Sequence, residues 1–209
     1  MSIPPHLTAT ALFDLHGRTA LITGARRGIG RAIALAFAAQ GAAVAIHHGG
    51  ADAEEYSDAA AVLAEILAMG GAAKTFPSDL APAGAGAALA ARVSAELAPP
   101  DILILNASIE LVEDYIDITT EHFDRQMAVN MRAPLELLQG LVPGMKSRGW
   151  GRVVGIGSIQ QMRPARDMMV YAGTKAAQLN WIANLARQVA GTGVTANNLA
   201  PGAIWTARN

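Results

Sequence analysis

The chain contains no cysteine among its 209 residues. This absence excludes disulfide bonds, thiolate catalysis and zinc sites with cysteine ligands. Aromatic residues make up only 5% of the chain, although 52% of it is hydrophobic. The core must therefore be built mainly from alanine, valine, isoleucine and leucine, a composition that suits a parallel sheet covered by helices on both faces.

Long apolar runs and an excess of charge of one sign are also absent. No uncharged apolar stretch reaches the roughly 18 residues of a membrane-spanning helix, and the first residues lack the basic and apolar regions of a signal peptide. The formal net charge of −1 gives no electrostatic support for a nucleic-acid partner. We therefore expect a cytoplasmic protein that binds neither membranes nor nucleic acids.

Short apolar runs alternate with alanine-rich, helix-like segments along the whole chain. Such alternation favours right-handed crossovers and a doubly wound parallel sheet of the Rossmann type, in three αβα layers. With no internal linker, we expect one α/β domain over residues 1–209, of which residues 1–15 form a loose arm. Strands are predicted at 18–23, 42–46, 73–76, 101–106, 152–158 and 194–199, and helices at 28–40, 52–69, 85–97, 120–146 and 171–189.

Tyr171 and Lys175 are four residues apart, so a helix places them on one face, about one turn from each other. A nearby ammonium group stabilises a phenolate and lowers the pKa of a tyrosine from its ordinary value of about 10 toward a range useful for proton transfer. Ser158 ends a predicted strand, from which its hydroxyl can bind the same substrate oxygen. A Tyr–Lys pair alone is common on helices without any function, so the rest of the chain must decide.

A glycine-rich turn lies between the first predicted strand and the first predicted helix. Glycines there allow a sharp turn and a close approach to a pyrophosphate, and the helix N-terminus supplies N–H groups and a positive dipole. Its position after a strand and before a helix is the context that a dinucleotide-binding turn requires. The turn reads Thr23-Gly24-Ala25-Arg26-Arg27-Gly28-Ile29-Gly30.

The spacing of this turn matches the TGxxxGxG loop of the short-chain dehydrogenase/reductase family, and the chain resembles that family from about Leu15 to its end. Each motif is modest alone, but their order and their placement on the predicted elements make the set specific. The resemblance extends to the 3-oxoacyl-acyl-carrier-protein reductases as the first guess within the family. The further motifs are Asn106-Ala107, Asn130, Ser158, Tyr171-x-x-x-Lys175 and Pro201-Gly202-x-x-x-Thr206.

The resemblance implies hydride transfer between a nicotinamide and a carbonyl or alcohol carbon. Tyr171 would be the general acid in reduction and the general base in oxidation. Lys175 would tune this tyrosine and bind the nicotinamide ribose, and Ser158 would hold the reacting oxygen. Asn130 would hold a water that links Lys175 to bulk solvent.

The same resemblance implies a set of cofactor contacts along the chain. Asp79 and Leu80 would lie near the adenine, Ile204 would meet the carboxamide through its backbone, and Thr206 would lie near the pyrophosphate. The other implied contacts are Thr23, Gly24, Arg26, Arg27, Gly28, Ile29, Gly30, His47, Asn106, Ala107, Pro201 and Gly202.

The second predicted strand ends without the carboxylate that would bind the adenosine ribose hydroxyls and repel a 2′-phosphate. Arg27 lies where NADP-dependent members of the family often carry a base, and Arg26 adds a second. Charge-assisted bonds from arginine to phosphate are roughly twice as strong as neutral ones. We therefore expect NADP(H) in preference to NAD(H); the alternative is that either arginine is only a solvated surface charge.

The chain departs from the family pattern at two places. Ser108 stands where the family commonly has a glycine, which affects the backbone near the nicotinamide. The chain ends at Asn209, whereas family members usually continue with a substrate-covering helix and another strand. We expect six strands in this chain and a seventh in a C-terminal segment lost from it.

Other polar clusters give weaker signals. His47 and His48 are adjacent, so on a strand they point to opposite faces and cannot chelate one metal together; we expect no metal site. We interpret Glu54-Glu55 and Glu113-Asp114 as solvated faces. Arg163 and Arg166, in the segment between Ser158 and Tyr171, either receive an acidic substrate or carrier or are solvated. The helices that carry Asn130 and Tyr171 are compatible with a homodimer or homotetramer interface.

The sequence thus predicts an NADP(H)-dependent oxidoreductase with a small-molecule carbonyl or alcohol substrate, first of all a 3-oxoacyl-thioester reductase. A sugar or polyol dehydrogenase of the same family is the alternative within the enzyme class. A non-catalytic NADP-binding sensor or assembly partner is the alternative of another class.

Overall fold

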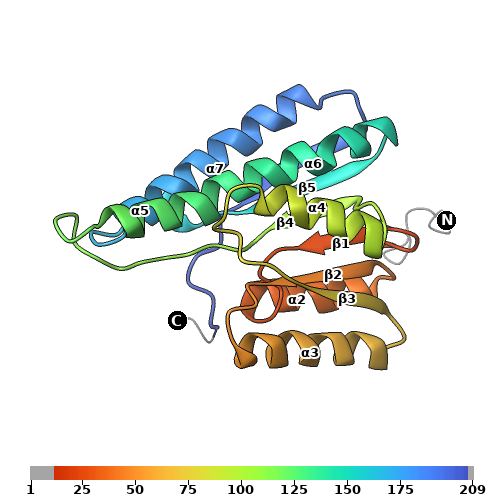
Figure 1. Cartoon of the computed structure of the whole chain (residues 1–209). Coiled ribbons are helices and arrows are strands. Elements are labelled where there is room, and N and C mark those ends of the chain that lie inside the picture. Colours follow the sequence, from red (N-terminus) through yellow and green to blue (C-terminus); the bar gives the residue numbers. More distant parts are fainter. Residues whose placement is uncertain (1–11, 207–209) are drawn as a thin grey trace, which may run out of the picture.

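The computed structural model describes residues 12–206 and contains a six-stranded sheet between two layers of helices (Figure 1). All neighbouring strands are parallel, and their spatial order is β3-β2-β1-β4-β5-β6. The expected Rossmann-type doubly wound sheet is therefore confirmed. The strands are β1 (Thr19–Ile22), β2 (Ala43–His48), β3 (Ala72–Pro77), β4 (Ile102–Leu105), β5 (Gly151–Ile156) and β6 (Val194–Leu199).

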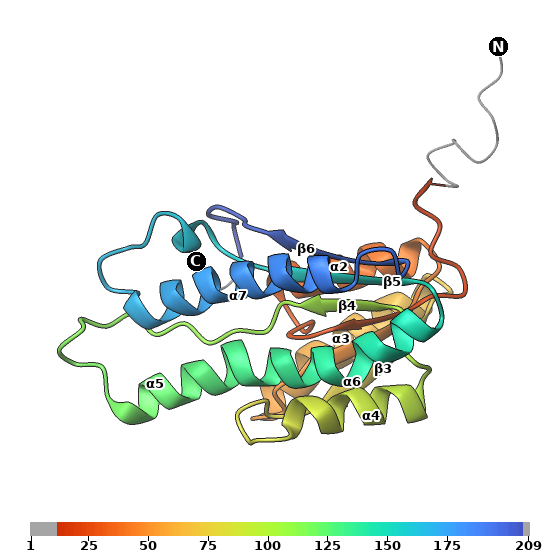
Figure 2. The same ribbon diagram turned by 90° about the horizontal axis from the view of Figure 1, so that it is seen from above.

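The helices divide between the two faces of the sheet. The first two cover one face, and the others cover the opposite face, where α6 lies between α4 and α7 (Figures 1 and 2). Helix α3 begins after Asp52, whose carboxylate accepts a hydrogen bond from the Glu55 N–H. The helices are α2 (Gly28–Ala39), α3 (Ala53–Ala68), α4 (Ala85–Glu96), α5 (Thr120–Met127), α6 (Ala133–Ser147) and α7 (Met169–Gln188).

Successive residues of the central strands point into two separate cores. Along β4, Ile102 and Ile104 join the cluster under α2 and α3, whereas Leu103 and Leu105 join the cluster under α4, α6 and α7. Because both faces of the sheet are covered, these strands are apolar throughout, as the composition predicted. No helix within residues 12–206 is long and apolar enough to cross a lipid bilayer.

The strand order reverses between β1 and β4. From β1 the chain moves outward to β2 and β3, then returns to β4 on the other side. In open α/β sheets, ligands bind at such a switch point, outside the carboxyl ends of the strands. The turn after β1 and the loops after β4 and β5 therefore meet at one edge of the sheet.

The helical region expected at residues 120–146 is interrupted. Between α5 and α6 lies one wide π-helical turn, η2 (Ala128–Arg132), which carries Asn130. Pro134 follows in the first turn of α6. Because proline lacks an N–H, it cannot donate to the carbonyl of Asn130 one turn earlier, and the regular helical bonding is lost there.

Ser158 does not end a strand as expected. Strand β5 stops at Ile156, and Ser158 instead caps a short 3-10 helix, η3 (Ile159–Gln161). Its hydroxyl oxygen accepts a hydrogen bond from the Gln160 N–H at 3.2 Å. This cap fixes the side chain at the carboxyl edge of the sheet, where the other candidate residues lie.

Candidate active site

Two hollows join into one cleft at the carboxyl edge of the sheet. A hollow of about 420 Å³ lies among the β1–α2 turn and the ends of β2 and β3, and one of about 280 Å³ contains Ser158, Tyr171 and Lys175. The two share four lining residues: Ile29, Asn106, Ser108 and Thr206. A larger hollow of about 800 Å³ between α6 and α7 contains none of the predicted site residues, so size alone does not identify the site.

The β1–α2 turn needs its glycines for two different reasons. Gly24 and Gly28 have φ angles of 66° and 56°, which other residues rarely adopt. At Gly30 the constraint is space, because a Cβ would lie 2.3 Å from the Gly24 carbonyl oxygen and 2.6 Å from Asn106 Nδ2. The turn therefore presents bare backbone and the start of α2 to the cleft, a surface suited to a pyrophosphate.

Thr23 and Asn106 tie the ends of β1 and β4 together. The Thr23 hydroxyl donates to the Ile104 carbonyl and accepts from the N–H groups of Asn106 and Ala107, at 2.9–3.1 Å. The Asn106 amide donates to the carbonyls of Thr23 and Gly24 at 2.9 and 3.0 Å. These two predicted cofactor residues thus also fix the shape of the turn.

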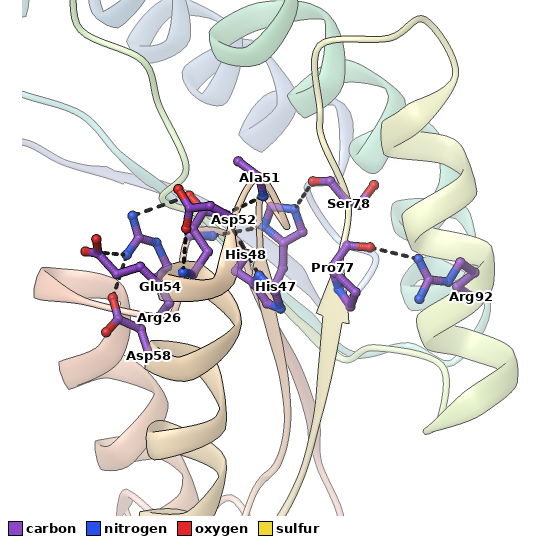
Figure 3. A network of polar contacts seen from close by, with 12 residues as sticks. Arg26, His47, His48, Ala51, Asp52, Glu54, Asp58, Pro77, Ser78 and Arg92 are labelled. Carbon is purple, nitrogen blue, oxygen red and sulfur yellow. Dashed lines mark hydrogen bonds and ion pairs between the residues drawn. The ribbon is translucent and has the colours of Figure 1, made fainter.

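His47, labelled in Figure 3, holds the β1–α2 turn through a hydrogen bond. Its Nδ1 accepts a hydrogen bond from the Gly24 N–H at 3.1 Å, and its Nε2 donates to the Ser78 carbonyl at 2.9 Å. Burial lowers the pKa of His47 to about 4, so the ring is neutral at physiological pH. His47 lines the cleft as predicted, but backbone groups occupy both of its nitrogens.

Arg26 lines the same hollow but is bound to α3 (Figure 3). Its guanidinium lies 2.5 Å from Asp58 and 3.3 Å from Glu55, and Glu54 is 4.0 Å away. The side chain of Glu55 is only 17% exposed and lines the hollow, so its interpretation as a solvated face is wrong. Arg27, by contrast, is exposed at the rim, where no hydrogen bond or ion pair within residues 12–206 engages its guanidinium.

His47 and His48 point to opposite faces, as predicted. The His48 ring lies edge-on to Tyr56 of α3, with its Nδ1 at 3.9 Å from Glu55. Burial lowers the pKa of His48 as well. Within residues 12–206 no group of three His, Asp or Glu side chains is arranged to hold a metal ion.

Tyr171 and Lys175 lie on one face of α7, as the spacing predicted. Both are buried, and the Lys175 Nζ lies 5.6 Å from the centre of the Tyr171 ring. Lys175 donates to the Ile156 carbonyl at the end of β5, at 2.7 Å. The strand end and the helix thus bring Tyr171, Lys175 and Ser158 to the wall of one hollow.

Asn130 connects the π-helical turn to this group. Its Oδ1 accepts from the Ile109 N–H at 2.8 Å, and its Nδ2 donates to the Ile109 carbonyl at 2.8 Å and to Thr174 Oγ1 at 3.1 Å. Thr174 directly precedes Lys175. Asn130 therefore anchors the loop after β4 against α7, close to Lys175.

The remaining predicted contacts also line the cleft. Asp79 accepts a hydrogen bond from the Ala81 N–H at 3.0 Å in a local turn; it does not cap α4, which begins after Gly84. Leu80 and Ala107 lie in the larger of the two cleft hollows, Pro201, Gly202 and Ile204 in the smaller, and Thr206 in both.

The site also includes polar side chains that the sequence analysis did not select. Arg125 of α5 lines the larger hollow, and Glu110 lines the hollow with Tyr171. Gln178 places its Oε1 3.4 Å from the Lys175 ammonium. Of these, only Gln178 could have been found from the sequence, because it follows Lys175 by three residues and so lies on the same face of the predicted helix.

Known proteins share this arrangement. The chain aligns with a 3-oxoacyl (acyl-carrier-protein) reductase from Agrobacterium tumefaciens C58, solved with NADP bound, at a TM-score of 0.92 and 44% identity, over 98% of this chain and 77% of that one. A putative NAD(P) dependent gluconate 5-dehydrogenase from Beutenbergia cavernae, solved with bound NADP, gives a TM-score of 0.85 and 34% identity over 93% and 76% of the two chains.

Curated sequences agree with these structures. The uncharacterized oxidoreductase YghA of Escherichia coli (strain K12) is 37% identical over 194 residues, which span 92% of this chain and 64% of that protein. A family model described as short chain dehydrogenase matches residues 18–209. The chain therefore belongs to the short-chain dehydrogenase family.

Proposed function

We propose that the protein is an NADP(H)-dependent oxidoreductase that passes a hydride between the nicotinamide and a carbonyl or secondary-alcohol carbon. The observation that carries this proposal is the meeting of Tyr171, Lys175 and Ser158 in a hollow continuous with the cleft at the glycine-rich turn. The cleft fits the cofactor, because Gly24 and Gly28 line it without side chains and Arg27 places an exposed cation at the rim. When bound, the nicotinamide supplies or receives the hydride.

The protein's own residues handle the proton and the substrate oxygen. The Tyr171 phenol gives its proton to the oxygen in reduction and takes it back in oxidation. The buried Lys175 ammonium places a positive charge beside this phenol. The Ser158 oxygen already accepts the Gln160 N–H, which leaves its own O–H to donate to the substrate oxygen.

The preference for NADP(H) rests on Arg27 in this proposal. Three carboxylates of α3 surround the Arg26 guanidinium, and Arg27 carries the unneutralised charge at the rim. The NADP-bound neighbours support the choice. Glu55 lines the same hollow, and Arg26, which also pairs with Asp58, offsets only part of the negative charge there, so a 2′-phosphate depends on Arg27.

A 3-oxoacyl thioester is the first substrate class that we propose. The name and the structure of the Agrobacterium reductase support it. A sugar or polyol is the second candidate, because Glu110 puts a carboxylate, a good acceptor for substrate hydroxyls, into the hollow of Tyr171. The gluconate dehydrogenase neighbour supports this alternative.

A cofactor-linked screen tests the function and separates these substrates. NADPH oxidation with short 3-oxoacyl thioesters, compared with NADP⁺ reduction by a panel of sugars and polyols, identifies the class by the higher kcat/KM. If no carbonyl or alcohol turns over while NADPH binds tightly, the oxidoreductase proposal is wrong and the non-catalytic sensor takes its place.

We further propose a cytoplasmic homodimer or homotetramer formed through α5, α6 and α7. Leu135 and Trp181 are exposed on this face and line the hollow between α6 and α7. Light scattering after size exclusion measures the state directly. Substitution of both residues by serine should then shift the protein toward the monomer.

A further inference from the structure

Gln178 contacts Lys175 from the same helix, α7, three residues further along the chain. Its Oε1 lies 3.4 Å from Lys175 Nζ, which also donates to the Ile156 carbonyl at 2.7 Å, and its side chain is almost fully buried. An ammonium group only donates hydrogen bonds. The oxygen of the Gln178 amide must therefore face Lys175, and its Nε2 must face away.

A second, partly buried set of contacts starts at Ser158. The Gln161 Oε1 lies 3.5 Å from the Ser158 N–H, with which it forms a capping box, and it accepts from Asn198 Nδ2 at 3.1 Å. Because a backbone N–H only donates, Gln161 presents its oxygen and Asn198 presents its amino group. The Asn198 Oδ1 must then face away from Gln161.

The two outward-facing amide atoms both lie close to Gly155. Gln178 Nε2 and Asn198 Oδ1 are both buried, and neither has a hydrogen-bond partner within residues 12–206. A Cβ at Gly155 would lie 2.5 Å from the first and 3.1 Å from the second, so both converge on this glycine. One atom is a donor and the other an acceptor, and a direct bond or one bridging water joins such a pair.

Gly155 of β5 and Gly157, just after this strand, make room for these side chains. Gly155 lies opposite Asn198 in the parallel pairing of β5 with β6. A Cβ at Gly157 would lie 2.4 Å from Gln161 Oε1 and 2.6 Å from Asn198 Nδ2. Any larger residue at either position would displace the amide groups.

We propose that Gln178, Asn198 and Gln161 form an amide relay that positions Lys175 and Ser158 relative to each other. The contacts of Lys175 with Gln178, of Asn198 with Gln161 and of Ser158 with Gln161 are observed, and the proposal adds the link between Gln178 Nε2 and Asn198 Oδ1. The inference rests on the proposed function, which makes Lys175 and Ser158 the groups that act. Gln178 and Asn198 are positioning residues that touch neither substrate nor cofactor.

The relay has a signature in the pH dependence of the reaction. Gln178→Met keeps the shape of the side chain but removes the acceptor that favours the charged lysine. The titratable side chains that line this hollow, within residues 12–206, are Glu110, Tyr171 and Lys175. We expect kcat for alcohol oxidation to fall roughly 10- to 100-fold, with little change in KM, and the acidic limb of its pH profile to move to higher pH.

Gln188→Met is the matched control, because Gln188 is an exposed amide on the same helix whose side chain bonds to Asn184, at 2.6 Å, and lies outside both cleft hollows. This variant should behave as wild type. A Gln178→Met profile that superimposes on the wild-type profile would overturn the positioning role, as would an equal shift in Gln188→Met.

A thermal double-mutant cycle tests the contact itself without any substrate. The melting temperatures of Gln178→Met, Asn198→Leu and the double variant are compared with wild type. If the relay exists, the melting temperature of the double variant falls by less than the sum of the decreases in the two single variants. Additive losses overturn the relay, whether or not the enzyme turns over; absence of turnover in the wild type instead overturns the proposed function.

Discussion

His47, which contacts the β1–α2 turn, makes the stability of the fold depend on pH. Burial lowers its pKa to about 4, whereas an unfolded histidine titrates near 6.5. The folded protein therefore binds this proton less readily than the unfolded chain does. The contribution to stability is complete above pH ~6.5 and is lost as the pH falls toward ~4.

We expect the protonation of His47 to lower the free energy of unfolding by up to about 3 kcal/mol between neutral pH and pH ~4. Urea titrations at a series of pH values measure the slope. His47→Asn keeps an acceptor for the Gly24 N–H but cannot be protonated, so the slope should shrink. Burial lowers the pKa of His48 too. His48 therefore contributes to the pH dependence of unfolding that remains in His47→Asn. An unchanged slope in the variant contradicts the assignment.

Tyr171→Phe isolates the proton-transfer step. Phenylalanine keeps the buried ring and removes the acidic hydroxyl, so kcat should fall roughly 10²- to 10⁴-fold. NADPH binding, followed by the fluorescence of the cofactor, should remain near the wild-type affinity. Tyr115→Phe is the control, because this tyrosine is 68% exposed and lies outside both cleft hollows. Near-normal turnover in Tyr171→Phe would refute the role.

For single residues, the spacing in the sequence predicted which side chains belong to the site better than it predicted which side chains they contact. Tyr171 and Lys175 were recognisable because a helix fixes their relation within one turn. The pairing of Arg26 with Asp58 joins residues 32 positions apart and depends on how α3 packs beside the β1–α2 turn. The position of Glu55 in the cleft wall has the same origin. No local pattern encodes such contacts.

Among the elements, the β1–α2 turn carries the proposed preference for NADP(H). Arg27→Ala removes the exposed cation and should lower kcat/KM for NADP(H) about 10- to 100-fold, the equivalent of one hydrogen bond to a charged group. The value for NAD(H) should hardly change. Arg31→Ala is the control, because Arg31 of α2 pairs with Glu65, at 2.6 Å. Equal losses with both cofactors would show that Arg27 does not read the phosphate.

The α5–α6 region shows what an element-level prediction leaves out. The helical pattern predicted a helix over residues 120–146, but not the π-helical turn inside this region. The side chain of Asn130 in this turn bonds to two other segments, to Ile109 after β4 and to Thr174 of α7. The sequence specifies that one carbonyl loses its donor, and tertiary packing decides how the helix responds.

For the whole molecule, alternating strands and helices with apolar runs were sufficient to predict the parallel sheet. Right-handed crossovers restrict such a chain to very few topologies, and the observed order has its switch between β1 and β4. The cleft follows from that order, because the turn after β1 and the loop after β4 must separate there. The ends of two strands thus become one binding edge.

Cofactor binding at this edge should stabilise the entire fold, because a ligand that binds only the folded state shifts the unfolding equilibrium. At a concentration of 100 times Kd the gain is about 2.7 kcal/mol, which corresponds to roughly 5–10 °C in Tm for a chain of this size. We expect NADP⁺ to reach this shift at a lower concentration than NAD⁺ in thermal unfolding of the wild type, and Arg27→Ala to remove the difference. Equal shifts with both cofactors in the wild type would contradict the proposed preference. A full shift without turnover on any substrate would leave cofactor binding in place and point to the non-catalytic sensor.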